Sequence, residues 1–138
     1  MGKQSRTSTV KGVDALFDRV DGEQFFVDLV EYFYFGVSGD PLLRPLYPED
    51  LTESKHHLAL FLTQYWGGPT TYNETRGHPR LRMRHVPFVI GPAERDAWLR
   101  HMQAAVARLV TEERLTASDA EELNDYLVMA AHSLVNAP

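Results

Sequence analysis

The middle of the chain reads Gly77-His78-Pro79-Arg80-Leu81-Arg82-Met83-Arg84-His85-Val86-Pro87-Phe88. Pro79 can begin a helix and Pro87 must end one, because the proline ring fixes φ and removes a backbone donor. The interval leaves room for about two turns at ~3.6 residues per turn. A helix this short is not stable by itself and gains little from burying one leucine and one methionine. We therefore expect another group, such as a bound prosthetic group, to hold it in place.

His85 is the centre of this stretch. It lies four residues after Leu81, so both side chains fall on one face of the expected helix. The arginines spread around the rest of it: Arg80, Arg82 and Arg84. An imidazole on an apolar face, with cations beside it, is what an iron porphyrin with two carboxylates requires. A surface histidine in a basic loop explains the same residues and stays open at this point.

Composition limits the chemistry available to the chain. Its 138 residues are 43% hydrophobic, which suffices for one domain with a real core. Cysteine is absent, which excludes disulfides, thiolate-bound metals, iron–sulfur clusters and haem attached through a Cys-x-x-Cys-His motif. A metal must therefore be bound by histidine, carboxylate or tyrosine, or arrive inside a cofactor.

Charge and hydropathy exclude further classes. The net charge of −5 argues against general nucleic-acid binding, although residues 76–84 form a local basic patch. The start of the chain is polar and lacks a signal-peptide pattern, and no apolar run has membrane length. We expect a cytoplasmic protein without membrane contact.

Apolar residues recur at helical spacing in about five segments, near 13–20, 23–37, 50–66, 91–109 and 116–134. Strand signals are nearly absent, so the pattern predicts an all-α domain of about five helices around one core. Two prolines make residues 40–48 a corner, and residues 70–78 show no period and are expected to form a loop. Residues 1–11 are predicted to be a disordered leader, and residues 12–138 the folded domain.

The third expected helix carries two further signals. Asp50 and Glu53 resemble a capping box at its start. Ser54 is the only polar member of an otherwise apolar stripe. A small polar residue there marks a place where something other than a side chain fits, or a serine bonded to its own helix, and the pattern leaves both open.

The sequence lacks the residues that several other kinds of active site require. A di-iron bundle needs two Glu-x-x-His pairs, and only Glu53 with His56 has that spacing. No Gly-x-Ser-x-Gly elbow is present, and Gly67-Gly68 is followed by proline rather than by the Lys-Ser or Lys-Thr of a phosphate-binding loop.

Several longer motifs resemble one family closely, the truncated haemoglobins of group II, specifically the O type of actinobacteria. The resemblance runs from about residue 14 to the C-terminus. Its motifs are Pro48-Glu49-Asp50, Gln64-Tyr65-Trp66-Gly67-Gly68-Pro69, Arg76 to His85, Glu94-Arg95-Asp96-Ala97-Trp98-Leu99 and Ala130-Ala131-His132-Ser133-Leu134-Val135-Asn136. One departure is Asp21-Gly22, where the family usually has paired glycines between the first two helices.

The resemblance implies a globin-like two-over-two helical sandwich that binds haem b without a covalent bond. His85 would be the proximal iron ligand. The polar contacts to a bound ligand would come from Tyr34, Tyr47 and Trp98. Ser54 and Leu58 would face the ligand from the third helix, so no distal histidine is expected.

The remaining haem contacts are also expectations from the resemblance. Cations or donors for the propionates would be Arg84, His57 and Tyr72. The apolar wall would be Phe61, Leu62, Leu81, Phe88 and Met129. We expect His101 and His132 to be surface or core histidines rather than ligands.

The function implied is binding of O₂, CO, NO and other small haem ligands. Phenol and indole donors would make release slow, which suits redox detoxification of NO or peroxide better than transport. An unidentified reductase and a homodimer are further expectations. The alternative from another class is a haem-free helical interaction module that uses the basic patch at 76–84.

Overall fold

The computed structural model describes residues 15–76 and 90–136. The predictions for the leader and for the His85 segment lie outside these residues. The described helices are α1 (Leu16–Arg19), α2 (Gly22–Ser38), α3 (Thr52–Tyr65), α4 (Thr71–Arg76), α6 (Pro92–Thr111) and α7 (Ala117–Ser133), with a 3-10 turn at Arg44–Leu46. Within these ranges the fold is all helical, as predicted.

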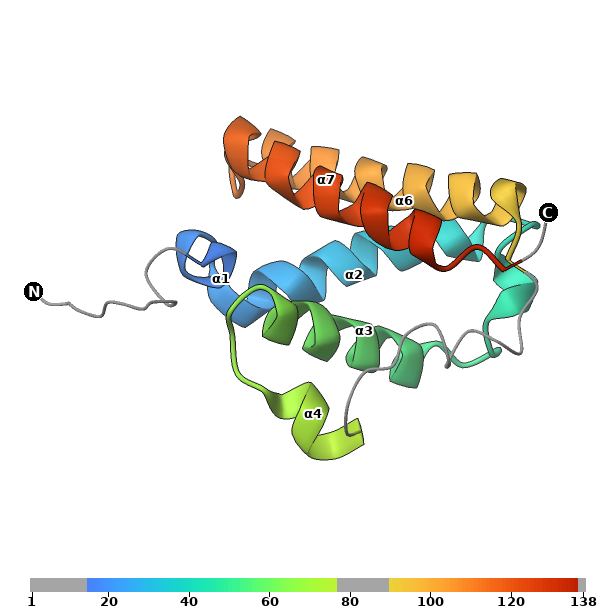
Figure 1. The fold of residues 1–138 in the computed structure, drawn as a ribbon, viewed down its shortest axis with the longest axis horizontal. Helices are drawn as coiled ribbons and strands as arrows, with labels where there is room; N and C mark the ends of the chain where they lie inside the picture. The colour runs from blue at the N-terminus through green and yellow to red at the C-terminus, as the bar shows by residue number, and fades with distance from the viewer. Residues whose placement is uncertain (1–14, 77–89, 137–138) are drawn as a thin grey trace, which may run out of the picture.

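Two pairs of long helices build the domain (Figure 1). α2 packs against α3 on one side and against α6 on the other, and α7 packs against α6. The four helices thus form the two-over-two arrangement that the sequence implies, with α1 beside the start of α2. No helix in the described ranges is long and apolar enough to cross a membrane.

The core lies along one face of α2 and continues onto α6 and α7. The apolar residues that recur at helical spacing in the predicted segment 23–37 are buried: Phe26, Leu29, Val30, Phe33 and Val37. Facing them, α6 buries Met102, Val106 and Leu109, and α7 buries Leu123 and Leu127. Each such side chain stabilises the fold by about 1.5–3 kcal/mol when buried. The residues that supply this stability are those that recur at helical spacing in the sequence.

The helix α4 corrects the prediction of a loop at residues 70–78. Its six residues are too few to show a period, and its stability comes from tertiary packing. Tyr72 is buried, with its ring 5.5 Å from that of Phe61 on α3. The hydroxyl of Thr70 also donates to Glu74 at 3.2 Å across the first turn.

The helix starts are held differently from one another. The capping box predicted for α3 is wrong: Asp50 accepts from the N–H of Thr52, and Glu53 does not bond back to the backbone at the start of the helix. The start of α7 has a side-chain cap, because the hydroxyl of Thr116 accepts from the N–H of Asp119 at 3.1 Å. At the start of α3 the carboxylate of Asp50 accepts from the amide two residues later in the chain. It thereby satisfies a backbone donor that a capping box would otherwise have satisfied.

Glycine is required at the ends of the helix pair α2 and α3. Gly22, at the start of α2, has φ +62°, a conformation that glycine adopts without steric cost. Gly67 ends α3 with φ +104°, and a Cβ there would collide with the Cβ of Ala15. The single glycine of Asp21-Gly22 therefore supplies the left-handed residue that the turn needs.

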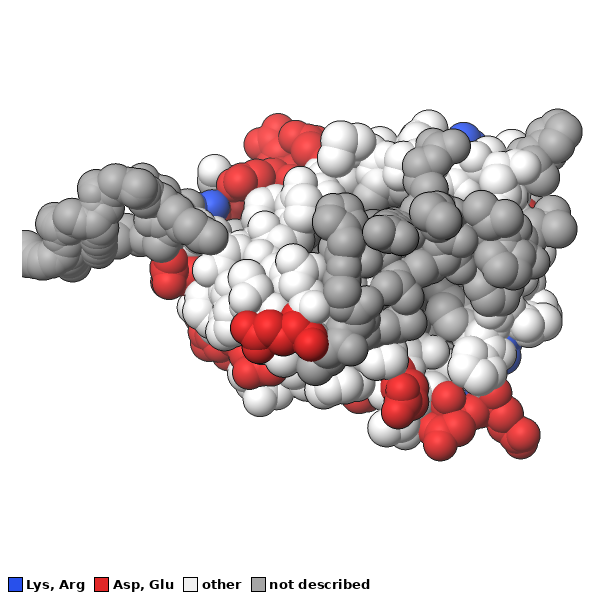
Figure 2. All heavy atoms as spheres, turned by 60° about the horizontal axis from the view of Figure 1, so that its bottom comes forward, with Lys and Arg blue, Asp and Glu red and all other residues white. Residues whose placement is uncertain are grey.

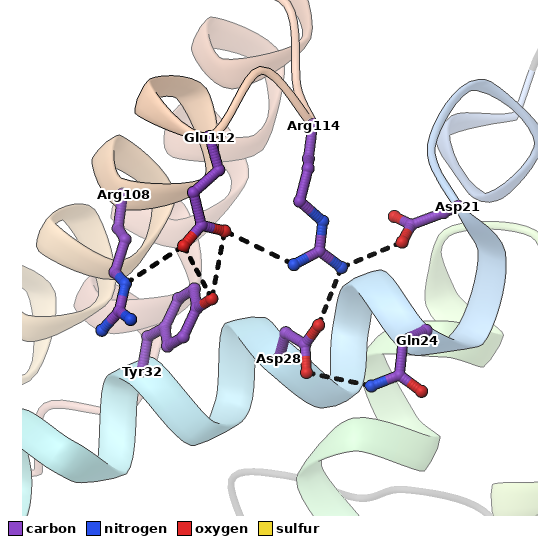
Figure 3. A network of polar contacts seen from close by, with 7 residues as sticks. All are labelled: Asp21, Gln24, Asp28, Tyr32, Arg108, Glu112 and Arg114. Carbon is purple, nitrogen blue, oxygen red and sulfur yellow. Dashed lines mark hydrogen bonds and ion pairs between the residues drawn. The ribbon is translucent and has the colours of Figure 1, made fainter.

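A polar network ties the N-terminal half of α2 to the turn between α6 and α7 (Figure 3). The guanidinium of Arg114 lies 2.9 Å from Asp21, 2.8 Å from Asp28 and 3.4 Å from Glu112. The hydroxyl of Tyr32 donates to Glu112, at 2.9 Å from one carboxylate oxygen. We call these five residues the Arg114 network.

Candidate functional site

A cavity of about 460 Å³ lies among α2, α3, α6 and α7. Its volume falls within the roughly 300–1,000 Å³ of small-molecule and cofactor sites. Aliphatic and aromatic side chains from α3, α6 and α7 supply most of its wall, among them Leu58, Leu62, Met102, Leu127 and Leu134. Such a slot suits a largely apolar group.

Two tyrosines line one part of this cavity. Tyr34 projects from the C-terminal half of α2 and is 3% exposed, and Tyr47 follows the 3-10 turn. Their ring centroids lie 5.3 Å apart with the planes at 82°. Ser54 of α3 hydrogen-bonds to the phenol of Tyr34 and lines the cavity too. These side chains place hydroxyl groups in surroundings that are otherwise apolar.

Burial keeps both phenols protonated. It raises the pKa of Tyr34 well above the ordinary value of 10.0, the neighbouring Tyr47 adds to the rise, and the hydrogen bond with Ser54 opposes it. Burial also raises the pKa of Tyr47 to about 12. Each phenol therefore keeps its proton at neutral pH and remains a hydrogen-bond donor.

Trp98 brings a third donor to the cavity from α6. It is half-buried and lines the cavity. Its ring lies 5.7 Å from that of Phe33 on α2, and Phe33 in turn lies 4.9 Å from Tyr34. Edge-to-face contacts of this kind fix ring orientation as well as contributing to the packing.

The corner that carries Tyr47 is held by Arg44. Its guanidinium donates to the carbonyl oxygens of Tyr47 at 3.3 Å, Pro48 at 2.9 Å and Glu49 at 2.8 Å. Three otherwise unpaired carbonyls are thereby satisfied by one side chain, which stabilises an irregular segment containing two prolines. Tyr47 is consequently fixed although it lies in no regular helix.

The opposite wall combines aromatic and ionisable groups. Phe61, Leu62 and Tyr72 are buried there, and His57 lies at the cavity with its Nε2 3.7 Å from a carboxylate oxygen of Glu53. Arg95 of α6 also lines the cavity. Cationic groups at an apolar slot are what a planar group with anionic substituents would use.

Most of the site residues predicted from the sequence line this one cavity: Tyr34, Tyr47, Ser54, His57, Leu58, Phe61, Leu62, Tyr72 and Trp98. Met129 is not brought to it, since its side chain is 59% exposed and does not line the cavity. Four predicted residues lie outside the described part of the chain: Leu81, Arg84, His85 and Phe88.

Sequence reasoning missed other lining residues. Met102, Leu127, Ala130 and Leu134 were expected only as members of apolar stripes, and the structure turns them toward the cavity. Leu43, Leu46 and Ile90 belong to segments without a period, so nothing local marked them. Arg95 had a signal, because it precedes Trp98 by three residues and shares its face of α6.

The described residues fit a haem. They supply an apolar slot, protonated phenols and an indole, and a histidine and an arginine at its wall. No group of three or more His, Asp or Glu in the described ranges could hold a metal by itself. Among the described residues, an iron in this cavity would therefore have to arrive inside a macrocycle.

Comparison with known proteins identifies the family. The family model described as bacterial-like globin matches residues 15–133. The chain is 43% identical to the group 2 truncated hemoglobin YjbI of Bacillus subtilis over 115 residues, which are 83% of this chain and 84% of that protein. The chain belongs to the group II truncated haemoglobins. As a member of this family it is a haem-based binder of diatomic ligands.

Solved structures agree with the fold. A thermostable hemoglobin from the actinobacterium Thermobifida fusca superposes with a TM-score of 0.85 at 53% identity, covering 90% of this chain and 98% of that one. A truncated oxygen-avid haemoglobin from Bacillus subtilis superposes with a TM-score of 0.82 at 41% identity, covering 89% of this chain and all of that one. The truncated globin architecture is thus confirmed over most of the chain.

Proposed function

We propose that this truncated haemoglobin binds haem b without a covalent bond, with His85 as the proximal ligand, and releases O₂, CO and NO slowly. The observation that supports this most directly is the convergence of Tyr34, Tyr47 and Trp98 on one cavity. Haem supplies an iron that binds diatomic molecules and shifts electron density onto them. A donor in surroundings that exclude water stabilises such a ligand best.

The donors set the expected release rate. A hydrogen bond to a charged group contributes roughly 1.5–3 kcal/mol, which lengthens residence about tenfold to a hundredfold. Tyr34 and Tyr47 are protonated at neutral pH, as tyrosines ordinarily are, and burial raises both pKa values further. With Trp98 they offer up to three donors, and two acting together already make release slow.

The rest of the cavity would hold the macrocycle. Leu58, Phe61 and Leu62 would pack against it, and Tyr72 and His57 would reach its carboxylates, with Arg95 added to this set by the structure. Roles for three other predicted residues remain part of the proposal: Leu81, Arg84 and Phe88.

Haem uptake by the cavity can be tested by filling it. Ala131 is buried and lines the cavity, whereas Ala107 on α6 is exposed and does not. Hemin titrated into the haem-free protein should give a saturable Soret band in the wild type and in Ala107→Phe. Ala131→Phe should bind hemin weakly or not at all. Equal, saturable binding by both variants would place haem outside this cavity, and a wild type without a saturable Soret band would favour the haem-free interaction module.

A redox role follows from slow release. A carrier must release its ligand quickly, whereas buried donors favour retention, so we include oxidation of NO or reduction of peroxide in the proposal. Such turnover requires a separate reductase. Repeated turnovers with peroxide and a reducing dye, while the Soret band survives, would support it, and rapid bleaching would favour a binding protein.

Two broader expectations belong to the same proposal. A homodimer would show in sedimentation as twice the mass of the 15.7 kDa chain. A cytoplasmic location would show on cell fractionation. The ligand chemistry proposed for the cavity does not depend on the outcome of either experiment.

A further inference from the structure

A carboxylate–imidazole pair joins the end of α2 to the middle of α6. Asp40 follows α2 directly, and its Oδ2 lies 2.7 Å from Nε2 of His101. Because a carboxylate only accepts, the imidazole N–H donates. The side chains are 12% and 19% exposed, so solvent screens this bond less than a surface ion pair. The other oxygen of Asp40 accepts from the N–H of Leu42 at 2.9 Å.

Gly36 makes room for this pair. It lies on the last turn of α2, and a Cβ at that position would collide with Nδ1 of His101. The imidazole therefore lies directly against the backbone of α2. Phe33, one turn earlier on α2, contacts Trp98, which lies three residues before His101 on α6. The pair of Asp40 and His101 thus lies one helical turn away from the contact between Phe33 and Trp98, at the same crossing of α2 and α6.

Asp40 is also the first residue of the corner that carries Tyr47. Its carbonyl accepts from the N–H of Arg44 at 2.9 Å, and the carbonyl of Arg44 accepts from the N–H of Tyr47 at 3.2 Å. Leu43, which is buried and lines the cavity, lies between them. A displacement of Asp40 would therefore be carried through two hydrogen bonds to Tyr47.

The two arginines near the corner do not make this connection. Arg100 lies 3.6 Å from Oδ2 of Asp40, but its side chain is 65% exposed, so the pair is weak. Arg44 binds carbonyls of the corner itself. Of these three side chains, His101 is the one that connects the corner to α6 through a buried hydrogen bond.

We propose that His101 is a positioning residue, which through Asp40 fixes the corner bearing Tyr47 relative to the face of α6 bearing Trp98. The two donors then stand at a fixed separation and reach one ligand together. This inference rests on the proposed function for its effect on ligands, but the mechanical connection between Asp40 and His101 is independent of haem.

The test removes the bond from either end. His101→Leu keeps similar bulk without a donor, Asp40→Ala removes the acceptor, and His101→Gln restores an N–H. His132→Leu is the matched control, because the imidazole of His132 bonds to the Val128 carbonyl of its own helix and is exposed. Amide hydrogen exchange over residues 42–47 should accelerate by about tenfold in either bond-removing variant, as expected for one hydrogen bond to a charged group. The control and His101→Gln should match the wild type.

The ligand readout separates positioning from general stability. His101→Leu should speed O₂ dissociation by about fivefold, the equivalent of roughly one neutral hydrogen bond, and should shift the C–O stretching band of the CO complex toward that of Tyr47→Phe. In a Tyr47→Phe background His101→Leu should have no further effect. An undiminished effect in that background would overturn the proposal, as would wild-type exchange at residues 42–47. If the protein took up no haem, the exchange result would still decide whether the connection exists.

Discussion

The two halves of α2 are attached to α6 by opposite means. The N-terminal half is joined by the Arg114 network, in which carboxylates and a guanidinium meet at the surface (Figure 3). The C-terminal half is joined by buried rings, by the close approach of Gly36, and by the pair of Asp40 and His101. The cavity opens beside the second half, where Tyr34 lines it, whereas Tyr32 in the same half bonds to Glu112 and does not line it.

The difference shows where this chain keeps its chemistry. Charges at a surface retain most of their hydration, so the Arg114 network contributes modest stability and no ligand contacts. Tyr34 and Tyr47 instead place hydroxyl groups in the largely apolar surroundings of the cavity. Acidic side chains are prominent among the described residues of the face in Figure 2, and the basic patch predicted at 76–84 is not among the side chains described.

The largest effect should come from Trp98. Trp98→Phe keeps the contact with Phe33 but removes the indole N–H. We expect O₂ dissociation to rise about tenfold to a hundredfold, the value of one hydrogen bond to a charged ligand. Stopped-flow measurement on the reduced protein gives the rate directly, and an unchanged rate would remove Trp98 from the mechanism.

Two tyrosines two residues apart, on different faces of α2, give the sharpest comparison of the Arg114 network with the cavity. Tyr34→Phe removes a hydroxyl that lies in the cavity, and Tyr32→Phe removes one that donates to Glu112. The first should speed O₂ release by about tenfold while the second leaves it unchanged. If the two variants behaved alike, the assignment of one face of α2 to the Arg114 network and another to ligand binding would be wrong.

Loss of the Arg114 network should change the free energy of unfolding rather than ligand release. Arg114→Ala removes ion pairs with Asp21 and Asp28 and should lower the free energy of unfolding by about 1–2 kcal/mol, because several weak pairs are lost together. Ligand release should stay at the wild-type rate. Chemical denaturation with kinetics on the same sample checks both, and a change in release rate would show that the two halves are coupled.

The smallest expected effect is a dependence of the melting temperature on acidic pH. The hydrogen bond from Tyr32 holds the pKa of Glu112 below its ordinary value of 4.5, and bonds from Arg108 and Arg114 act in the same direction. A lowered pKa in the folded state contributes stability above 4.5 that is lost as the pH falls through the lower folded value. The melting temperature of Glu112→Gln should therefore lie below that of the wild type at neutral pH and approach it in acid. A difference that stayed constant into acid would contradict this assignment.

Periodicity predicted the long helices because their apolar stripes are local and repeat over several turns. Phe26, Leu29 and Phe33 could be assigned to a core without knowing what they contact. The helix α4 could not be predicted, since its six residues show no period and the burial of Tyr72 depends on Phe61 of another helix.

The site was predicted through motifs rather than through physics alone. Tyr34, Tyr47 and Trp98 are ordinary core residues by pattern, and only the resemblance brought them together. Met129 shows the limit of that approach, because the face of α7 that lines the cavity carries Leu127, Ala131 and Leu134 at helical spacing, and Met129 falls off it. The pair of Asp40 and His101 joins residues far apart in the chain, so no local pattern could have indicated it.

The absorption spectrum of the purified protein tests the central claim most directly. It should be recorded in the ferric state, after reduction and under CO, for the wild type, His85→Ala and, as a control, His56→Ala. We predict a Soret band that shifts on reduction and on CO binding, is lost or altered in His85→Ala and is unchanged in His56→Ala, whose parent side chain is exposed and does not line the cavity. A featureless spectrum that added hemin cannot change would contradict the account.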